Sequence, residues 1–203
     1  MSQNTNYRVL AVTKNIPIEH ILPVLRGQNI NLIGESRWQE AKEKLQLLPT
    51  GVEKHFIGHL QTNKVPEVVE HFDYIESVDS LSLAKAVAIA AAKIGKTMPI
   101  FLQVNISHDP AKYGFLPEQL QSTVEQIEQF EHLELVGLMA ITAKQDKKKT
   151  RHDFAEMKKL QIQFGLRELS MGMSDDWQIA VEEGATIVRL GTALFGERFS
   201  ARL

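Results

Sequence analysis

Short apolar runs alternate with longer amphipathic segments from one end of the chain to the other. The short runs have the length of buried strands, whereas the longer segments repeat their apolar residues every three or four positions, as helices do. Alternation of this kind is typical of an α/β fold in which each parallel strand is followed by a helix. Strands are predicted at residues 9–12, 31–34, 55–58, 74–75, 100–106, 135–141, 169–171 and 186–188.

Several predicted helices in the first half have recognisable ends. Pro17 suits the start of a helix that runs to residue 26, and Ser80 is expected to cap a helix that ends at Gly95. A short helix is expected to begin near Asn63. The helix after the second strand presents one apolar face, made of Trp38, Ala41, Leu45 and Leu48.

Three helices are predicted in the second half. One begins at Pro117, and another begins at Thr150 with Asp153 completing a capping box. Residues 174–176 start the third, which ends near Gly184. The run of lysines at 147–149 is interpreted as a solvated loop before the second of these helices.

Eight strand and helix units in 203 residues amount to about 25 residues each, close to the minimum for a (β/α)8 barrel. An open doubly wound sheet is the alternative. The chain shows no linker or shift in composition, so residues 1–203 are expected to form a single domain.

Composition narrows the class of protein. Hydrophobic residues make up 43% of the chain and the net charge is −2, which favours a folded protein that binds neither nucleic acid nor anionic membranes. With no cysteine, disulfides and thiolate chemistry are excluded. Residues 1–8 lack the apolar stretch of a signal peptide, and residues 84–94 are too short to span a bilayer, so a soluble cytoplasmic protein is expected.

Polar residues collect where the predicted strands end. In parallel α/β folds the carboxyl ends of the strands and the loops after them form the site, so these residues are the candidates for chemistry. They are Lys14, Glu35, Ser36, His59, Ser77, Asp79, Asn105, Met139, Thr142, Ser174, Arg189, Gly191 and Thr192.

Lys14 follows an entirely apolar strand, so its amine is expected at the mouth of the barrel. Desolvation there lowers a lysine pKa and makes the amine able to form an imine. A lysine that simply extends to solvent at the end of a strand is the alternative.

The segment from Arg189 to Thr192 follows the last predicted strand. Gly191 allows backbone N–H groups to approach a phosphate, and Thr192 adds a hydroxyl. Ser174, at the end of the neighbouring strand, is a second candidate phosphate ligand. An ordinary turn between a strand and a helix is the alternative.

A metal site is not expected. His55 and His59 have helical metal-pair spacing, but they lie in a predicted strand, where four residues separate the imidazoles by about 13 Å. Trp38 and Trp177 lie on amphipathic stripes and are interpreted as core residues rather than as stacking partners for a nucleotide.

Five segments together resemble the pyridoxal phosphate homeostasis protein family, and the resemblance covers nearly the whole chain. Residues 109–114 look most like cyanobacterial members of that family. The five segments are residues 11–14, 33–40, 55–64, 169–176 and 189–196.

The resemblance implies a single barrel similar to the N-terminal domain of alanine racemase, with pyridoxal 5′-phosphate (PLP) as its cofactor. Lys14 would form the internal aldimine with PLP, and Ser174, Gly191 and Thr192 would hold the phosphate. Arg189 would face the pyridine nitrogen. Ser36 stands where the family commonly has asparagine, so a hydrogen bond near the cofactor is expected to be shortened or lost.

The resemblance also implies a carrier or regulator of vitamin B6 and amino-acid pools rather than an enzyme. An arginine at the ring nitrogen does not give up a proton, so the ring would be a poor electron sink. None of the three tyrosines stands in a motif for a second proton-transfer group. A weak amino-acid racemase and a lysine aldolase are the enzymatic alternatives.

Two further expectations concern the whole molecule. Family members usually have a helix before the first strand, whereas here Tyr7 already starts it, so one face of the barrel is expected to be less covered. A compact barrel without the racemase partner domain favours a monomer. No motif for an apoenzyme or regulatory partner stands out.

Overall fold

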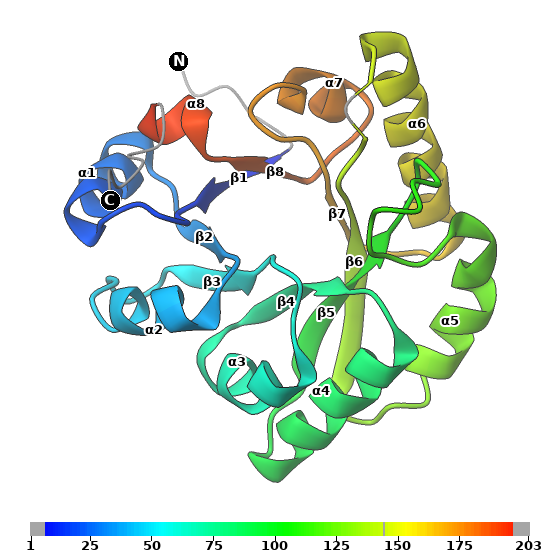
Figure 1. Ribbon diagram of the computed structural model, residues 1–203, viewed down its shortest axis with the longest axis horizontal. Coiled ribbons are helices and arrows are strands. Elements are labelled where there is room, and N and C mark those ends of the chain that lie inside the picture. The colour runs from blue at the N-terminus through cyan, green and yellow to red at the C-terminus, as the bar shows by residue number, and fades with distance from the viewer. Residues whose placement is uncertain (1–6, 144, 197–203) are drawn as a thin grey trace.

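The computed structural model describes residues 7–143 and 145–196, and in them eight parallel strands form a closed barrel (Figure 1). The strands follow one another around the ring in chain order, which confirms the predicted (β/α)8 barrel. They are β1 (Arg8–Val12), β2 (Leu32–Glu35), β3 (Glu53–Phe56), β4 (Tyr74–Val78), β5 (Met98–Val104), β6 (Leu133–Ala140), β7 (Glu168–Ser170) and β8 (Ile187–Leu190).

Helices surround this ring, one or more after each strand (Figure 1). Short 3-10 turns, η1 (Thr62–Lys64) and η2 (Pro117–Gln119), precede α3 (Val65–His71) and α5 (Leu120–Ile127). The helices are α1 (Ile18–Gln28), α2 (Trp38–Leu45), α3 (Val65–His71), α4 (Leu81–Lys93), α5 (Leu120–Ile127), α6 (Lys147–Gln163), α7 (Trp177–Glu182) and α8 (Thr192–Phe195).

Pairing of the first strand with the last excludes an open sheet. β1 and β8 are parallel neighbours, with Leu10 opposite Arg189 and Ala11 opposite Leu190. The loops after β1 and β8 therefore lie side by side at the carboxyl end of the barrel, although they come from opposite ends of the described chain.

Residues of each strand alternate between the inside of the barrel and the layer beneath the helices. Inside lie Leu10, Phe101 and Met139, which form one cluster of buried residues. Ile75 and Val188 face outward into the larger cluster that the helices cover. Burial of these side chains stabilises the fold by about 25 cal/mol per Å² of apolar surface removed from water.

Two predicted helix ends are confirmed. The hydroxyl of Ser80 accepts a hydrogen bond from the backbone N–H of Leu83, as expected of an N-cap. Gly95, just after α4, has a φ of 66°, which suits glycine.

The predicted start of α6 was wrong by one turn. The helix begins at Lys147, because Asp146 caps it by accepting a hydrogen bond from the N–H of Lys149, so the lysines at 147–149 form its first turn rather than a loop. Thr150 instead donates its hydroxyl to the carbonyl of Asp146. The carboxylate of Asp153 accepts hydrogen bonds from the side chains of Ser107 and Gln145, so it does not complete the predicted capping box.

The predicted strand bounds differ from those observed by one to three residues: β5 and β6, predicted at 100–106 and 135–141, each begin two residues earlier, at Met98 and Leu133. β3 begins at Glu53 and ends at Phe56, so the predicted 55–58 was placed two residues late. β4 continues to Val78, beyond the predicted Ile75, because the polar Glu76 finds partners inside the barrel. Residues 1–6 lie outside the described residues, and the expectation of a missing helix before the first strand falls on them.

Candidate functional site

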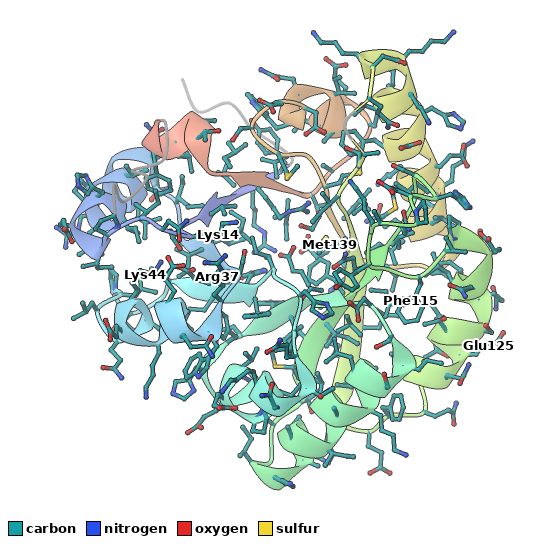
Figure 2. The ribbon with its side chains drawn as sticks, viewed as in Figure 1. Lys14, Arg37, Lys44, Phe115, Glu125 and Met139 are labelled. Carbon is teal, nitrogen blue, oxygen red and sulfur yellow. The ribbon has the colours of Figure 1, made fainter. Side chains whose placement is uncertain are left out.

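Lys14 lies two residues after β1 and lines a small cavity at the carboxyl end of the barrel. Figure 2 shows it on the inner side of the ring of strands, on the same side of the molecule as Arg37 and Lys44. The loop after β8 forms the other wall of the cavity. The lining residues are Val12, Lys14, Ile16, Gly191, Thr192, Phe195 and Gly196.

The loop after β8 directs backbone N–H groups toward Ser174. The hydroxyl oxygen of Ser174 accepts hydrogen bonds from the N–H of Gly191 at 3.4 Å and of Ala193 at 3.3 Å. A Cβ at position 191 would lie 3.7 Å from that of Val12, so a side chain there would extend into the space between β1 and this loop. Two backbone amides that converge on one oxygen atom form the kind of donor set that binds a phosphate group.

Arg189 lies inside the barrel and is 3% exposed. Its Nη1 donates to the hydroxyl of Ser170 at 2.8 Å and its Nη2 donates to the carbonyl of Ala140 at 2.7 Å. Burial lowers the pKa of Arg189, and the negative charges of Glu76 and Asp176 oppose that shift. A guanidinium carries five N–H donors, so these two bonds leave others for a ring nitrogen.

Below Arg189, buried polar groups continue toward the amino end of the barrel. The hydroxyl of Ser170 donates to Glu76 at 2.6 Å, and the other oxygen of Glu76 lies 2.6 Å from Nδ1 of His55. Burial by itself raises the pKa of Glu76, but the hydrogen bond with His55 and the charges of His55 and Arg189 outweigh it, so the pKa is lowered.

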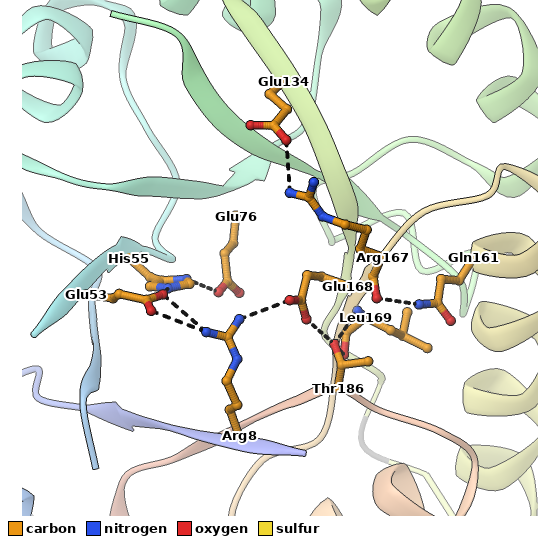
Figure 3. Close-up of polar contacts among 10 residues, drawn as sticks. All are labelled: Arg8, Glu53, His55, Glu76, Glu134, Gln161, Arg167, Glu168, Leu169 and Thr186. Atoms are coloured by element: carbon orange, nitrogen blue, oxygen red, sulfur yellow. Dashed lines mark hydrogen bonds and ion pairs between the residues drawn. The ribbon is translucent and has the colours of Figure 1, made fainter. Parts of the chain in front are cut away.

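An ion-pair network closes the amino end of the barrel (Figure 3). Arg8 of β1 bridges Glu53 of β3 at 3.2 Å and Glu168 of β7 at 3.1 Å. Nε2 of His55 lies 3.6 Å from Glu53, so His55 connects this network with Glu76. Polar residues therefore line the axis of the barrel from one end to the other.

Glu35 does not join the cavity, although the sequence placed it among the residues at strand ends. It faces outward from β2, where its carboxylate pairs with Lys44 of α2 at 2.5 Å and accepts the hydroxyl of Thr13 at 2.6 Å. Burial raises the pKa of Glu35, and the charge of Lys44 opposes this. The pair fixes α2 against β1 and β2.

Ser36 also lies away from the walls of the Lys14 cavity. It lines a neighbouring pocket, about 330 Å³ in volume, with Arg37, His59 and Lys64. The structure therefore does not bring Ser36 together with Lys14, Gly191 and Thr192 in one cavity.

The remaining predicted residues hold loops together at the carboxyl end. Ser77 donates to the carbonyl of Gly58, and Asp79 lies 3.1 Å from Nδ1 of His59. The side-chain amide of Asn105 donates to the carbonyl of Asp109, and Thr142 donates to Asp176. Met139 instead packs inside the barrel.

Ser170 and Glu76 were missed by the sequence analysis. A signal existed for Ser170, a polar residue at an inward position between the apolar Leu169 and Met171. Glu76 also lies at an inward position, but the polar Ser77 follows it, so its signal is weaker. The predicted fourth strand ends at Ile75, just before Glu76.

Comparisons with known proteins identify relatives over almost the entire chain. The family model described as alanine racemase, N-terminal domain, matches residues 1–199. A pyridoxal phosphate homeostasis protein of Synechocystis sp. is 39% identical, with 94% of this chain and 91% of that protein covered. A protein of the same name from Pseudomonas aeruginosa is 38% identical, covering 94% and 84%.

Solved structures agree with these relatives. PipY of Synechococcus elongatus without PLP has a TM-score of 0.88 at 37% identity, and the PLP-bound structure of PipY has a TM-score of 0.85. Both cover 96% of this chain and 95% of that one. An alanine racemase of Clostridium difficile, 17% identical, shares the fold with a TM-score of 0.76 over 98% of this chain and 54% of its own. The chain therefore belongs to the alanine racemase N-terminal domain family and, within it, to the pyridoxal phosphate homeostasis proteins.

Proposed function

We propose that this protein binds PLP and serves intracellular PLP and amino-acid homeostasis without a catalytic reaction of its own. The observation that carries the proposal is the cavity that unites Lys14 with the loop after β8, held by Ser174. The names of the relatives and the PLP-bound structure of PipY support it.

Residues of this chain are assigned to parts of the cofactor. Lys14 is proposed to hold the aldehyde carbon as an imine, and Ser174, Gly191 and Thr192 are proposed to bind the phosphate. A bound phosphate would take over the N–H groups of Gly191 and Ala193 that now donate to Ser174. Ser36 is assigned to the rim, beside the ring.

Arg189 is proposed to donate a hydrogen bond to the ring nitrogen, which argues against catalysis. PLP supplies an electron sink when its ring nitrogen is protonated, and a guanidinium does not provide that proton. Burial beside Glu76 keeps Arg189 a fixed donor in this position.

A weak racemase is the second candidate, and it needs a proton-transfer group opposite Lys14. Tyr74 is stacked on His55 inside the barrel, with ring centroids 4.4 Å apart, and Tyr7 packs on Trp177. Tyr113 stacks on His59 at 4.1 Å, among the loops at the carboxyl end. Tyr113 is therefore the residue to test, by deuterium exchange at the Cα of amino acids. Exchange no faster than with free PLP would reject the racemase.

The proposal includes a monomer of one domain over residues 1–203, located in the cytoplasm, with PLP as its ligand and neither nucleic acid nor membrane as a partner. In the described part of the chain, no helix is both long and apolar enough to cross a membrane. Delivery of PLP to apoenzymes is a further role that the site would allow.

The test of the proposed function is the visible absorption spectrum of the purified protein with PLP, before and after borohydride. An absorption band that disappears on reduction, with the adduct mapped to Lys14, is expected. Lys14→Ala should lose the covalent adduct, whereas the control Lys85→Ala, an exposed lysine on α4, should retain it. A protein that binds no PLP, or an adduct that persists in Lys14→Ala, would refute the proposal.

A further inference from the structure

Four buried polar side chains meet inside the barrel beneath the proposed cofactor site. They come from four different strands, β3, β4, β7 and β8, and each points inward. Three of them are 0% exposed and Arg189 is 3% exposed. The four residues are His55, Glu76, Ser170 and Arg189.

The hydroxyl of Ser170 lies between a cation and an anion. It accepts a hydrogen bond from Nη1 of Arg189 and donates its own proton to Oε2 of Glu76. A guanidinium only donates and an ionised carboxylate only accepts, so the direction of both bonds is fixed by the chemistry of the two ends. Each bond involves an ionised group, which makes it stronger than a bond between neutral groups.

Arg189 is therefore held from two sides. The charge of Glu76 attracts it toward the middle of the barrel, and the attraction is strong because water is excluded there. The carbonyl of Ala140, at the end of β6, holds Nη2 on the other side. The hydroxyl of Ser170 fills the space into which the guanidinium would otherwise move.

We propose that Ser170 is a positioning residue for the PLP site: its hydroxyl holds the guanidinium of Arg189 at the level of the ring nitrogen, against the attraction of Glu76. This inference rests on the proposed function, because it assumes that Arg189 contacts the cofactor ring. Neither Ser170 nor Glu76 touches the cofactor in this proposal.

Removal of the hydroxyl should displace Arg189. In Ser170→Ala, Nη1 of Arg189 and the carboxylate of Glu76 each lose a buried hydrogen-bond partner. The two groups can satisfy each other only by moving together into a direct ion pair. That pair would draw the guanidinium away from the ring, and PLP should bind about tenfold more weakly, as expected for loss of a hydrogen bond with a charged group.

Glu76→Gln removes the attraction but keeps the hydrogen bonds. The glutamine carbonyl can accept the proton of Ser170. Loss of the Glu76 charge favours the neutral imidazole of His55, whose Nδ1 can then accept from the glutamine amide. In the double variant Ser170→Ala/Glu76→Gln, the anion beneath Arg189 is gone and only the charge of Asp176, which every variant retains, still acts on the guanidinium. The double variant should therefore bind PLP more tightly than Ser170→Ala does. If the two substitutions only destabilised the buried core independently, their losses of affinity would instead be additive.

The experiment is a PLP titration, followed by absorption, of the wild type, Ser170→Ala, Glu76→Gln and the double variant, with thermal unfolding of each apoprotein. Weaker binding by Ser170→Ala that the second substitution partly restores is the expected result. Unchanged affinity in Ser170→Ala, or a double variant no tighter than Ser170→Ala, would overturn the inference. Failure of the wild type to bind PLP would instead refute the proposed function.

Asp153→Asn is the matched control. Asp153 is a buried carboxylate that accepts hydrogen bonds from Ser107 and Gln145, on loops outside the Lys14 cavity. This variant should lower the unfolding temperature and leave the PLP affinity unchanged, and an equal loss of affinity in it would also overturn the inference. If Ser170→Ala does not fold, Ser170→Cys, whose thiol hydrogen-bonds weakly, replaces it with the same expectations.

Discussion

At the scale of single residues, Gly58 shows how closely two strand ends approach one another at the carboxyl end of the barrel. A Cβ at this position would lie 2.2 Å from the carbonyl oxygen of Ser36 and 2.6 Å from its Cα. These are backbone atoms of the loop after β2, so they cannot turn aside as a flexible side chain would. Only a residue without a side chain at position 58 allows the backbone of Ser36 to lie this close.

We predict that Gly58→Ala lowers the free energy of unfolding by about 2–4 kcal/mol, because the backbone around Ser36 must move. Gly27→Ala is the matched control. Gly27 lies in α1 with nothing within 4 Å of its would-be Cβ, so alanine should stabilise the protein by about 0.5–1 kcal/mol. Urea unfolding measures both. Two changes of the same sign would contradict this account.

At the scale of elements, β3 and β4 are joined inside the barrel by a hydrogen bond between buried ionisable groups. Burial alone lowers the pKa of His55, but the carboxylate of Glu53, 3.6 Å from Nε2, and the hydrogen bond with Glu76 outweigh burial and raise the pKa above its ordinary value of 6.5. Arg8 faces Glu53 from β1, and Tyr74 stacks on the imidazole. Protonated His55 thus links β3 to β4 through Glu76, and the carboxylate of Glu53 on its own strand stabilises its charge.

The consequence is a pH dependence of stability. Because the folded-state pKa of His55 is raised, its contribution is fully present below about pH 6.5, the unfolded value, and is lost as the pH rises through the folded pKa. The difference in unfolding free energy between the wild type and His55→Gln should therefore be larger at pH 6 than at pH 9. Each unit of pKa shift corresponds to about 1.4 kcal/mol.

Urea unfolding at several pH values measures this difference. His152→Gln, an exposed histidine of α6, serves as the control and should leave the pH dependence of the wild type unchanged. A His55→Gln variant whose deficit is equal at both pH values would show that the imidazole acts in its neutral form.

Much of the element order could be predicted from the sequence because helix and strand periods are local properties. The end of a strand is harder to place when a polar residue finds its partner far away in the chain. Glu76 ended the predicted fourth strand, yet it lies within β4 because Ser170, in β7, donates a hydrogen bond to it. The start of α6 was missed for a different, local reason: both Asp146 and Thr150 are residue types that cap helices, and Asp146 is the one that accepts a hydrogen bond from the first turn.

At the scale of the whole molecule, large exposed apolar side chains in the described residues are scattered over several elements. Leu47 follows α2, Ile89 lies on α4, and Ile162 lies near the end of α6. Isolated apolar residues of this kind are normal on a monomer. We predict a single species close to 22.9 kDa in sedimentation equilibrium. A mass near twice that value across the concentration range would contradict the monomer.

The candidate site could be predicted in part from the closed shape of the barrel. Once a parallel barrel is assumed, the residues after each strand must share one end of it, so Lys14 and Gly191 could be placed together without knowing any contact. Which strand faces which across the interior could not be predicted in this way. Ser170 and Glu76 are 94 positions apart in sequence, and only the closed barrel brings them within 2.6 Å.

The pairing of β1 with β8 has a consequence for the order of events during synthesis. β8 is the last strand of the ring to be translated, so a nascent chain that ends at β7 carries Lys14 but lacks the loop of Gly191. Contacts between such distant segments form slowly, because the ends of a long loop must first meet. Nascent chains whose β8 has not yet left the ribosome should therefore be unable to capture the cofactor, and loading at the proposed site would distinguish molecules with a closed barrel from incomplete ones.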